Sequence, residues 1–218
     1  MNYLQKWWQT LVSVFFTQTC GVCGAETESG VFCQKCRCGA LMLANMPGLK
    51  NLDGAAMGYR YDGVLKDLLH KLKFEGESKF LQLLAEEAVF LVQAYRRSGF
   101  DMVVSIPTDA ARRTQRGFDI PESIFAKALA AKGAWRPQVL ARVKPTAPQY
   151  GLAPDKRRSN VQGCFKVQVS VSGAEILLVD DILTTGATLD EAAKTLKQAG
   201  AKSVYALTLC GSLENFKD

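Results

Sequence analysis

Residues 175–196 read EILLVDDILTTGATLDEAAKTL, and this stretch decides how the rest of the chain is interpreted. An apolar run, expected to be a buried strand over 176–179, ends in two neighbouring aspartates, Asp180 and Asp181. Threonines and a glycine follow, and a helical periodicity begins near Thr188 or Leu189. Hydroxyl and free backbone N–H groups at the start of a helix bind phosphate. Two carboxylates beside that phosphate suit ribose hydroxyls or magnesium, so the pattern predicts a sugar phosphate with vicinal hydroxyls as the ligand.

A plainer interpretation makes Asp180 a helix cap and Asp181 a surface residue. This interpretation does not account for the threonines and the glycine that follow. We therefore favour the ligand site, with both carboxylates at the carboxyl end of the strand.

Strand-like and helix-like segments alternate beyond residue 54. The strands are continuous apolar runs rather than alternating ones, which indicates a parallel sheet covered on both faces. Strands are expected at 55–61, 101–107, 138–143, 175–181 and 203–209, and helices at 65–74, 78–97, 122–132 and 188–200. Ligands bind beyond the carboxyl ends of such strands, so the loops after Ile106 and Val179 are predicted to form the site.

Most of the cysteines lie close together in the segment 20–39, CGVCGAETESGVFCQKCRCG. Two C-x2-C pairs at this spacing predict a four-thiolate structural zinc site with no open position for catalysis. The expected ligands are Cys20, Cys23, Cys33 and Cys36, with Cys38 as an alternative to Cys36. A redox role for one pair is the rival interpretation. The remaining cysteines, Cys164 and Cys210, lie in apolar stretches and are expected in the core.

The chain carries a formal charge of +6, which mildly favours anionic partners such as nucleotides, nucleic acid or a membrane surface. Apolar residues recur at helical spacing over 1–19, which predicts an amphipathic helix. This helix either packs on the body of the protein or docks on a membrane surface or partner. Its longest apolar run covers only 11–16, so neither a membrane span nor a signal peptide is expected. The predicted location is therefore cytoplasmic, where thiols stay reduced.

The motif at 175–188 resembles that of type I phosphoribosyltransferases, which bind 5-phosphoribosyl-1-pyrophosphate (PRPP) with magnesium. In that family the acidic pair contacts the ribose hydroxyls, and the loop that follows holds the 5′-phosphate. The resemblance implies that Asp180 and Asp181 are the ribose pair of a possible catalytic site. It assigns the phosphate loop to Thr184, Thr185, Gly186, Ala187 and Thr188.

Further segments, at 68–85, 105–119 and 147–160, together with the four-cysteine unit, resemble the ComF family of competence-associated phosphoribosyltransferase-like proteins. The resemblance covers residues 20–209 and implies three parts: a helix over 1–19, a zinc unit over 20–50 and a phosphoribosyltransferase-like domain over 54–218. It places at the pyrophosphate position Pro107, Arg112, Arg113 and Arg116. The family's later Gln, Leu, Arg and Asn pattern falls on Gln149, Leu152, Arg157 and Asn160.

Two departures lie beside the pyrophosphate loop. Asp119 and Ile120 stand where the family usually has Asn-Gln, and Thr108 and Asp109 stand where it more often has an apolar residue and His. We expect the added negative charge to weaken the hold on a leaving pyrophosphate. His70 is expected on a helix surface, without a catalytic role.

Two functions follow from the resemblance. The first is phosphoribosyl transfer with PRPP and magnesium, in which Arg forks hold pyrophosphate. The second is a protein of DNA uptake that binds single-stranded DNA or links competence helicase and recombination-loading partners. A second basic cluster, Lys156, Arg157 and Arg158, is expected in a loop that closes over the ligand or contacts DNA. The plainer interpretation of the first arginine cluster is a solvated basic turn.

Overall fold

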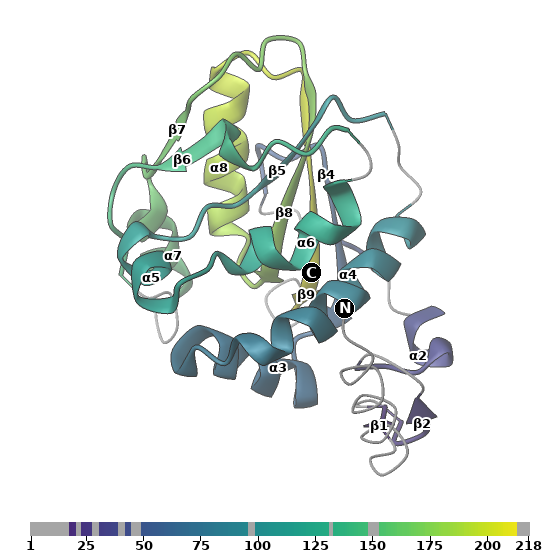
Figure 1. Ribbon diagram of the computed structural model, residues 1–218. Helices are drawn as coiled ribbons and strands as arrows, with labels where there is room; N and C mark the ends of the chain where they lie inside the picture. Colours follow the sequence, from purple (N-terminus) through teal and green to yellow (C-terminus); the bar gives the residue numbers. More distant parts are fainter. Residues whose placement is uncertain are drawn as a thin grey trace, which may run out of the picture.

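The computed structural model describes residues 18–20, 23–27, 31–38, 42–44, 49–95, 99–130, 133–147 and 153–212 (Figure 1). The helix predicted over 1–19 lies outside them except for its last two residues, which form strand β1 (Gln18–Thr19). Packing or membrane docking of that helix therefore stays a prediction. Within the described ranges, no helix combines the length and the apolar character needed to cross a membrane.

A five-stranded sheet forms the centre of the molecule, as the apolar runs predicted. Its strand order is β3-β4-β9-β8-β5, and every neighbouring pair is parallel except the antiparallel pair at the β3 edge. The strands are β3 (Met42–Ala44), β4 (Gly54–Arg60), β9 (Ser203–Gly211), β8 (Glu175–Leu183) and β5 (Met102–Ser105). The expected parallel sheet is thus present, with an antiparallel edge strand that the sequence did not reveal.

Helices cover both faces of this sheet (Figure 1). Leu177 and Val179 of β8 belong to the core that holds α4 (Leu81–Ala94) and α6 (Ile120–Leu129). Ile176 and Leu178, which point the other way, belong to the core of α8 (Ala187–Gln198). Because consecutive side chains of a strand face opposite sides, burial of all four explains why this strand is continuously apolar.

The helical run predicted over 65–74 divides in two. Helix α3 (Gly63–His70) passes directly into a π-helical turn, η1 (Lys71–Glu75), and a short 3-10 turn, η2 (Ser78–Phe80), leads into α4. Gly76 ends the π-turn with a φ of 69°, a left-handed conformation that glycine adopts without strain. The turn matters because it carries Lys73 to the site described below.

The predicted strand 138–143 is not part of the main sheet. Trp135, just before it, forms an isolated bridge with Val103 of β5, and Pro137, which has no N–H to donate, then begins a 3-10 turn, η4 (Pro137–Val139). Strand β6 (Leu140–Arg142) pairs instead with β7 (Phe165–Val167) in a separate antiparallel ribbon.

Both basic clusters, predicted in loops, lie on helices. The first is in α5 (Ala110–Arg116), where the carboxylate of Asp109 caps the helix by accepting the Ala111 N–H at 3.1 Å. The second is in α7 (Pro154–Val161), which starts on a proline, the residue best suited to a first helical position. Helical geometry spreads consecutive residues around an axis, so neighbouring basic residues point in different directions.

The cysteine-rich segment contains β2 (Glu26–Thr27), paired with β1, and the short helix α2 (Gln34–Cys38). It lies beside α4, whose fully buried Glu87 holds it (Figure 1). The Glu87 carboxylate accepts the N–H groups of Val31 at 2.8 Å and Phe32 at 3.3 Å, and two bonds from Arg37 at 2.9 and 2.7 Å. The Tyr59 hydroxyl of β4 also donates to it, at 2.7 Å. One carboxylate therefore joins the cysteine unit to the sheet domain.

Candidate functional site

A cleft of about 700 Å³ opens at the carboxyl ends of β5 and β8, where the parallel sheet predicted a ligand site. Its walls come from α3, η1, the loop after β5, α5, β6, α7 and the loop after β8. The lining includes six basic side chains and four acidic ones: Lys66, Lys73, Arg112, Arg116, Arg142 and Arg157, and Glu75, Asp109, Asp180 and Asp181. The cleft thus has a net positive lining around an acidic centre.

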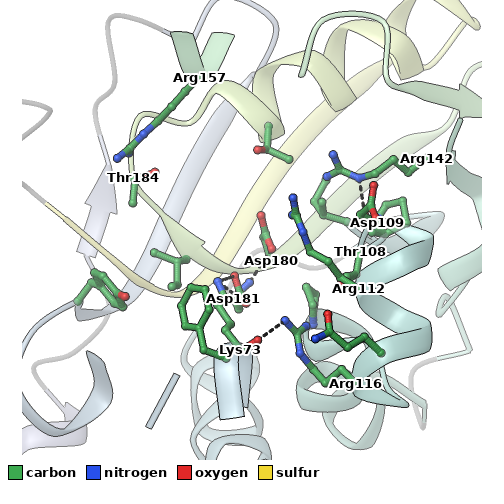
Figure 2. A pocket seen from close by; sticks show the side chains of 18 of the residues that line it. Lys73, Thr108, Asp109, Arg112, Arg116, Arg142, Arg157, Asp180, Asp181 and Thr184 are labelled. Carbon is green, nitrogen blue, oxygen red and sulfur yellow. Dashed lines mark hydrogen bonds and ion pairs between the residues drawn. The ribbon is translucent and has the colours of Figure 1, made fainter. Parts of the chain in front are cut away.

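Asp180 and Asp181 form that centre (Figure 2). They lie inside β8 rather than after it, because the strand continues to Leu183 and Asp180 pairs with Thr208 of β9. Their exposed fractions are only 9% and 6%, and the Asp181 N–H donates to Asp180 Oδ1 at 2.8 Å. Burial, followed by the charge of Asp181, raises the pKa of the Asp180 carboxyl well above its usual value. A carboxyl group that is protonated more easily can donate a hydrogen bond as well as accept one.

Lys73 contacts this pair from the opposite wall. Its Nζ lies 2.8 Å from Asp181 Oδ2 and 3.0 Å from Oδ1 (Figure 2). Burial lowers the pKa of Lys73, but attraction to Asp181 outweighs it and the net direction is upward, so the lysine stays charged. The segment LHKLKFEGE contributed to the family resemblance, yet its two lysines, Lys71 and Lys73, look alike in sequence, and the π-turn distinguishes Lys73.

The loop after β8 turns at Gly186 and leads into α8, and its role as a phosphate loop stays a prediction. Gly186 has a φ of 72° and precedes α8, and a Cβ atom there would lie 2.4 Å from Leu49 Cδ2. Leu49 therefore explains the glycine together with its backbone angle. Of the predicted loop residues, Thr184 and Thr188 line the cleft, whereas Thr185, Gly186 and Ala187 are not among its lining residues. Thr185 instead accepts the Ala187 N–H, at 3.5 Å.

The structure separates the three arginines of α5. Arg112 and Arg116 line the cleft, and Arg113 turns away to an ion pair with Glu122 at 3.9 Å. One Arg116 Nη donates to the Lys73 carbonyl at 2.8 Å, while its Nε is buried without a hydrogen-bond partner among the described residues. Burial, only partly offset by nearby acids, lowers the pKa of Arg116. A buried donor without a partner is uncommon, and a water molecule or a ligand oxygen would supply the missing bond.

The two aspartates that depart from the ComF pattern act as helix caps. Asp119 accepts the N–H groups of Thr108 at 2.7 Å and Glu122 at 3.2 Å. Asp109, which lines the cleft, caps α5 and also accepts the Thr146 N–H at 3.4 Å. Backbone donors thus bond to both carboxylates, which shape the loop that contains Pro107; their expected effect on a bound pyrophosphate stays a prediction.

Arg142 is a cleft residue that the sequence did not single out. Its Nε donates to the Pro107 carbonyl at 3.1 Å and one Nη to the Thr146 hydroxyl at 2.9 Å. Its guanidinium also lies 4.8 Å from the ring centre of Phe165. These contacts join the small ribbon of β6 and β7 to the loop after β5. Because they join separate elements, the local sequence pattern does not reveal them.

The second basic cluster is divided in the same way as the first. Arg157 lines the cleft near Thr184 (Figure 2), and Lys156 and Arg158 are exposed outside its lining. Asn160 both donates to and accepts from the backbone of Ala147, at 3.0 Å each. Gln149 and Leu152, from the same family pattern, lie outside the described residues.

The four predicted cysteines form a compact cluster. The Sγ atoms of Cys20, Cys23, Cys33 and Cys36 lie within 4.8 Å of one another, and those of Cys23 and Cys33 are 3.6 Å apart. Four sulfurs at about 2.3 Å from a tetrahedral zinc are about 3.8 Å apart, so the cluster can hold such an ion. Burial and hydrogen bonds from the other thiols raise the pKa of Cys36 to about 12, a cost that a bound cation would remove. The side chain of the alternative ligand, Cys38, lies outside the described part of the chain.

The remaining sequence predictions concern single side chains. Cys164 and Cys210 are buried in the core, as expected. His70 is exposed on α3, beside Phe74 and Glu75 and outside the cleft lining.

Comparison with known proteins agrees with this architecture. The phosphoribosyl transferase domain model matches residues 124–217, which contain the acidic pair and the loop after it. The chain is 34% identical to the DNA utilization protein YhgH of Salmonella typhi over 158 residues, which is 70% of each chain. It is 26% identical to competence protein F of Haemophilus influenzae, covering 85% of this chain and 81% of that one.

Among solved structures, the chain is similar to the glutamine PRPP amidotransferase of B. subtilis complexed with ADP and GMP. The TM-score is 0.39 at 18% identity, covering 57% of this chain and 26% of that one. The domain match and the parallel sheet confirm the predicted phosphoribosyltransferase fold with a small cysteine-rich unit.

Proposed function

The chain belongs to the ComF family of phosphoribosyltransferase-like proteins, and from this premise we propose that its cleft binds PRPP or a related ribose phosphate. The observation that carries the proposal is the buried pair Asp180 and Asp181, which faces Arg112 and Arg116 across the cleft. A ribose would place its hydroxyls on the carboxylates. Its 5′-phosphate would meet the start of α8 near Thr184 and Thr188.

The arginine wall supports a place for the diphosphate. Arg112 and Arg116 line this wall, and the Nε–H of Arg116 has no hydrogen-bond acceptor among the described residues. Magnesium would accompany PRPP, since it bridges phosphate oxygens and keeps several waters of its own. For a transfer reaction, the protein would position the ribose and stabilise the departing pyrophosphate. Release of pyrophosphate from PRPP with a panel of nucleobases and amines tests that step separately from binding.

Calorimetry with PRPP and magnesium tests the binding proposal. The double variant Asp180→Asn and Asp181→Asn should lose at least about a hundredfold in affinity, because each hydrogen bond to a charged group contributes about 1.5–3 kcal/mol. Asp67→Asn, on the exposed surface of α3 and away from the cleft lining, is the matched control and should bind as the wild type does. Unchanged binding in the double variant would refute the assignment.

A second candidate function is binding of single-stranded DNA. Its support is the basic lining of the cleft and the side chain of Phe74, which lines the rim and is 55% exposed. Basic grooves with exposed aromatic rings bind single strands through phosphate contacts and base stacking. Two relatives are named for DNA utilization and competence, so we also propose a role in DNA uptake with helicase or recombination-loading partners, in the cytoplasm.

Fluorescence anisotropy with a labelled oligonucleotide at increasing salt tests direct DNA contact. Binding through several phosphates should weaken steeply with salt. Phe74→Ala should weaken it by about 1–3 kcal/mol if a base stacks there. Binding that is absent at low salt, or insensitive to salt, would contradict direct contact.

We further propose that the cysteine cluster holds one structural zinc ion. Metal analysis of the purified chain should find about one zinc per molecule. The double variant Cys20→Ser and Cys23→Ser should lose the metal together with the fold of the unit. Full metal content in that variant would show that other residues hold the ion.

A further inference from the structure

Lys73 is held at the acidic pair by the backbone around it. The π-turn is rare in proteins and often marks functional sites. Leu72 beside it is fully buried, and the Lys73 carbonyl accepts Arg116 at 2.8 Å. The Gly76 N–H closes the turn on the Lys71 carbonyl. The backbone around Lys73 is therefore fixed on both sides, and its side chain is half-buried, 28% exposed.

Both oxygens of Asp181 already have a cation. Lys73 Nζ contacts Oδ1 and Oδ2 at 3.0 and 2.8 Å, and Asp181 in turn donates its backbone N–H to Asp180. Burial favours the neutral form of Asp180, so Lys73 balances most of the negative charge left on the pair. Magnesium needs anionic oxygens in a near-octahedral shell, and this arrangement leaves few of them.

We propose that Lys73 is the resident cation of the acidic pair and takes the place that a divalent metal would occupy beside Asp181. The pair then recognises ribose hydroxyls through Asp180 and the Asp181–Lys73 ion pair, without a metal ion between protein and sugar. Magnesium brought by a diphosphate ligand contacts that ligand's phosphates and not Asp181. This inference rests on the proposed ribose-phosphate site and specifies how that site recognises the ribose hydroxyls.

Metal binding to the protein alone gives the first test. Free Mn²⁺ is followed by electron paramagnetic resonance with the full-length, zinc-loaded protein in a buffer without chelator, because a chelator would strip the cysteine site. Mn²⁺ is the weakest first-row competitor for thiolates, so the cysteine site does not interfere. The wild type should bind no Mn²⁺ in the millimolar range, and Lys73→Gln should gain a site that Asp181→Asn removes again.

Two further variants control for charge and fold. Lys73→Arg keeps the positive charge and should bind no Mn²⁺. Lys79→Gln removes a lysine outside the cleft lining, paired with Glu77, and should behave as the wild type. Mn²⁺ binding by the wild type as tight as that of Lys73→Gln, and abolished by Asp181→Asn, would overturn the proposal.

Calorimetry with ribose 5-phosphate, with and without magnesium, gives the second test. The wild type should bind equally well in both buffers, within about twofold. Lys73→Gln should bind about tenfold more weakly without magnesium and recover when it is added, because the metal replaces the lost charge. If affinity for the wild type rises about tenfold with magnesium, the proposal is wrong. If ribose 5-phosphate binds in neither buffer, the proposed function fails, and the Mn²⁺ measurement still decides the role of Lys73.

Discussion

Two buried carboxylate centres of this molecule differ in how completely the protein satisfies them. Glu87, beneath the cysteine unit, is fully buried and accepts hydrogen bonds from two backbone N–H groups, Arg37 and Tyr59. Glu87 also shifts the pKa values of its neighbours. The hydrogen bond to Glu87 raises the pKa of Arg37, and burial together with the charge of Glu87 raises the pKa of Tyr59. Asp180, in the cleft, is nearly as buried but accepts a single hydrogen bond within the described part of the chain, from the Asp181 N–H.

This difference indicates two roles: Glu87 supports the fold, and Asp180 is available to a ligand. A saturated carboxylate has no capacity left for a ligand, and its loss leaves several buried donors unpaired. A carboxylate with spare capacity at a cleft costs stability that a ligand can recover. The same contrast holds between Arg37, paired twice with Glu87, and Arg116, whose Nε lacks a partner in the described chain.

The largest effect should come from breaking the saturated centre. Glu87→Gln keeps the shape but leaves Arg37 without its counter-charge, and we expect the free energy of unfolding to fall by about 3–5 kcal/mol. Urea denaturation followed by circular dichroism measures it. Glu86→Gln, at the half-buried residue that precedes Glu87 in α4, should change stability by less than about 0.5 kcal/mol. A similar small effect for both variants would mean that Glu87 does not hold the unit.

A smaller effect should come from the unsaturated centre, and it should depend on pH. Asp180 has a raised pKa in the folded state, so above the usual value of 3.8 the folded chain keeps a proton that the unfolded chain has lost. The wild type should therefore lose stability as pH rises through that window, by up to about 1.4 kcal/mol per unit.

Asp180→Asn removes this titration. The stability of the variant relative to the wild type should rise with pH and level off above the folded pKa of Asp180. Urea denaturation of both proteins at matched pH values measures the difference, in which effects on the cysteine site cancel. A difference that is flat or falls with pH would contradict the assigned direction.

The smallest effect compares two arginines on one helix. Arg116→Gln should weaken PRPP binding about tenfold, because Arg116 lines the cleft with an unpaired donor. Arg113→Gln should leave the affinity within about twofold, because Arg113 points away to Glu122. Calorimetry under one set of conditions measures both. Equal losses would mean that the charge of α5 matters and its orientation does not.

Much of the site could be predicted from contiguous sequence. The acidic pair, the glycine turn and the start of α8 follow one another within a single strand-turn-helix unit, so local pattern was sufficient to bring them together. The same holds for the cysteine pairs, whose spacing predicts a cluster that the structure contains. The predicted start of α8 was late by one or two residues, and β8 was longer than expected because its polar end still pairs with β9.

The sequence yields no prediction where the relevant contact joins distant segments. Lys73 and Asp181 are 108 residues apart, and Glu87 and Val31 are 56 apart. Sequence periodicity describes local spacing and contains no information on such distant pairs. A lysine or glutamate in an amphipathic helix therefore looks like a solvated surface residue. The direction of Arg113 against that of Arg116 likewise depends on a helix, α5, that the sequence analysis treated as a loop.

The sequence by itself determined the sheet class, the acidic pair with its phosphate-type loop and the cysteine cluster, because short-range spacing and apolar periodicity encode them. Tertiary structure alone decided which charges meet. It placed Lys73 on Asp181, Arg142 on the Pro107 loop and Glu87 under the cysteine unit. The physical reason is that a buried charged group is costly unless it is paired. Folding brings partners from separate elements within hydrogen-bond distance, and the local sequence does not.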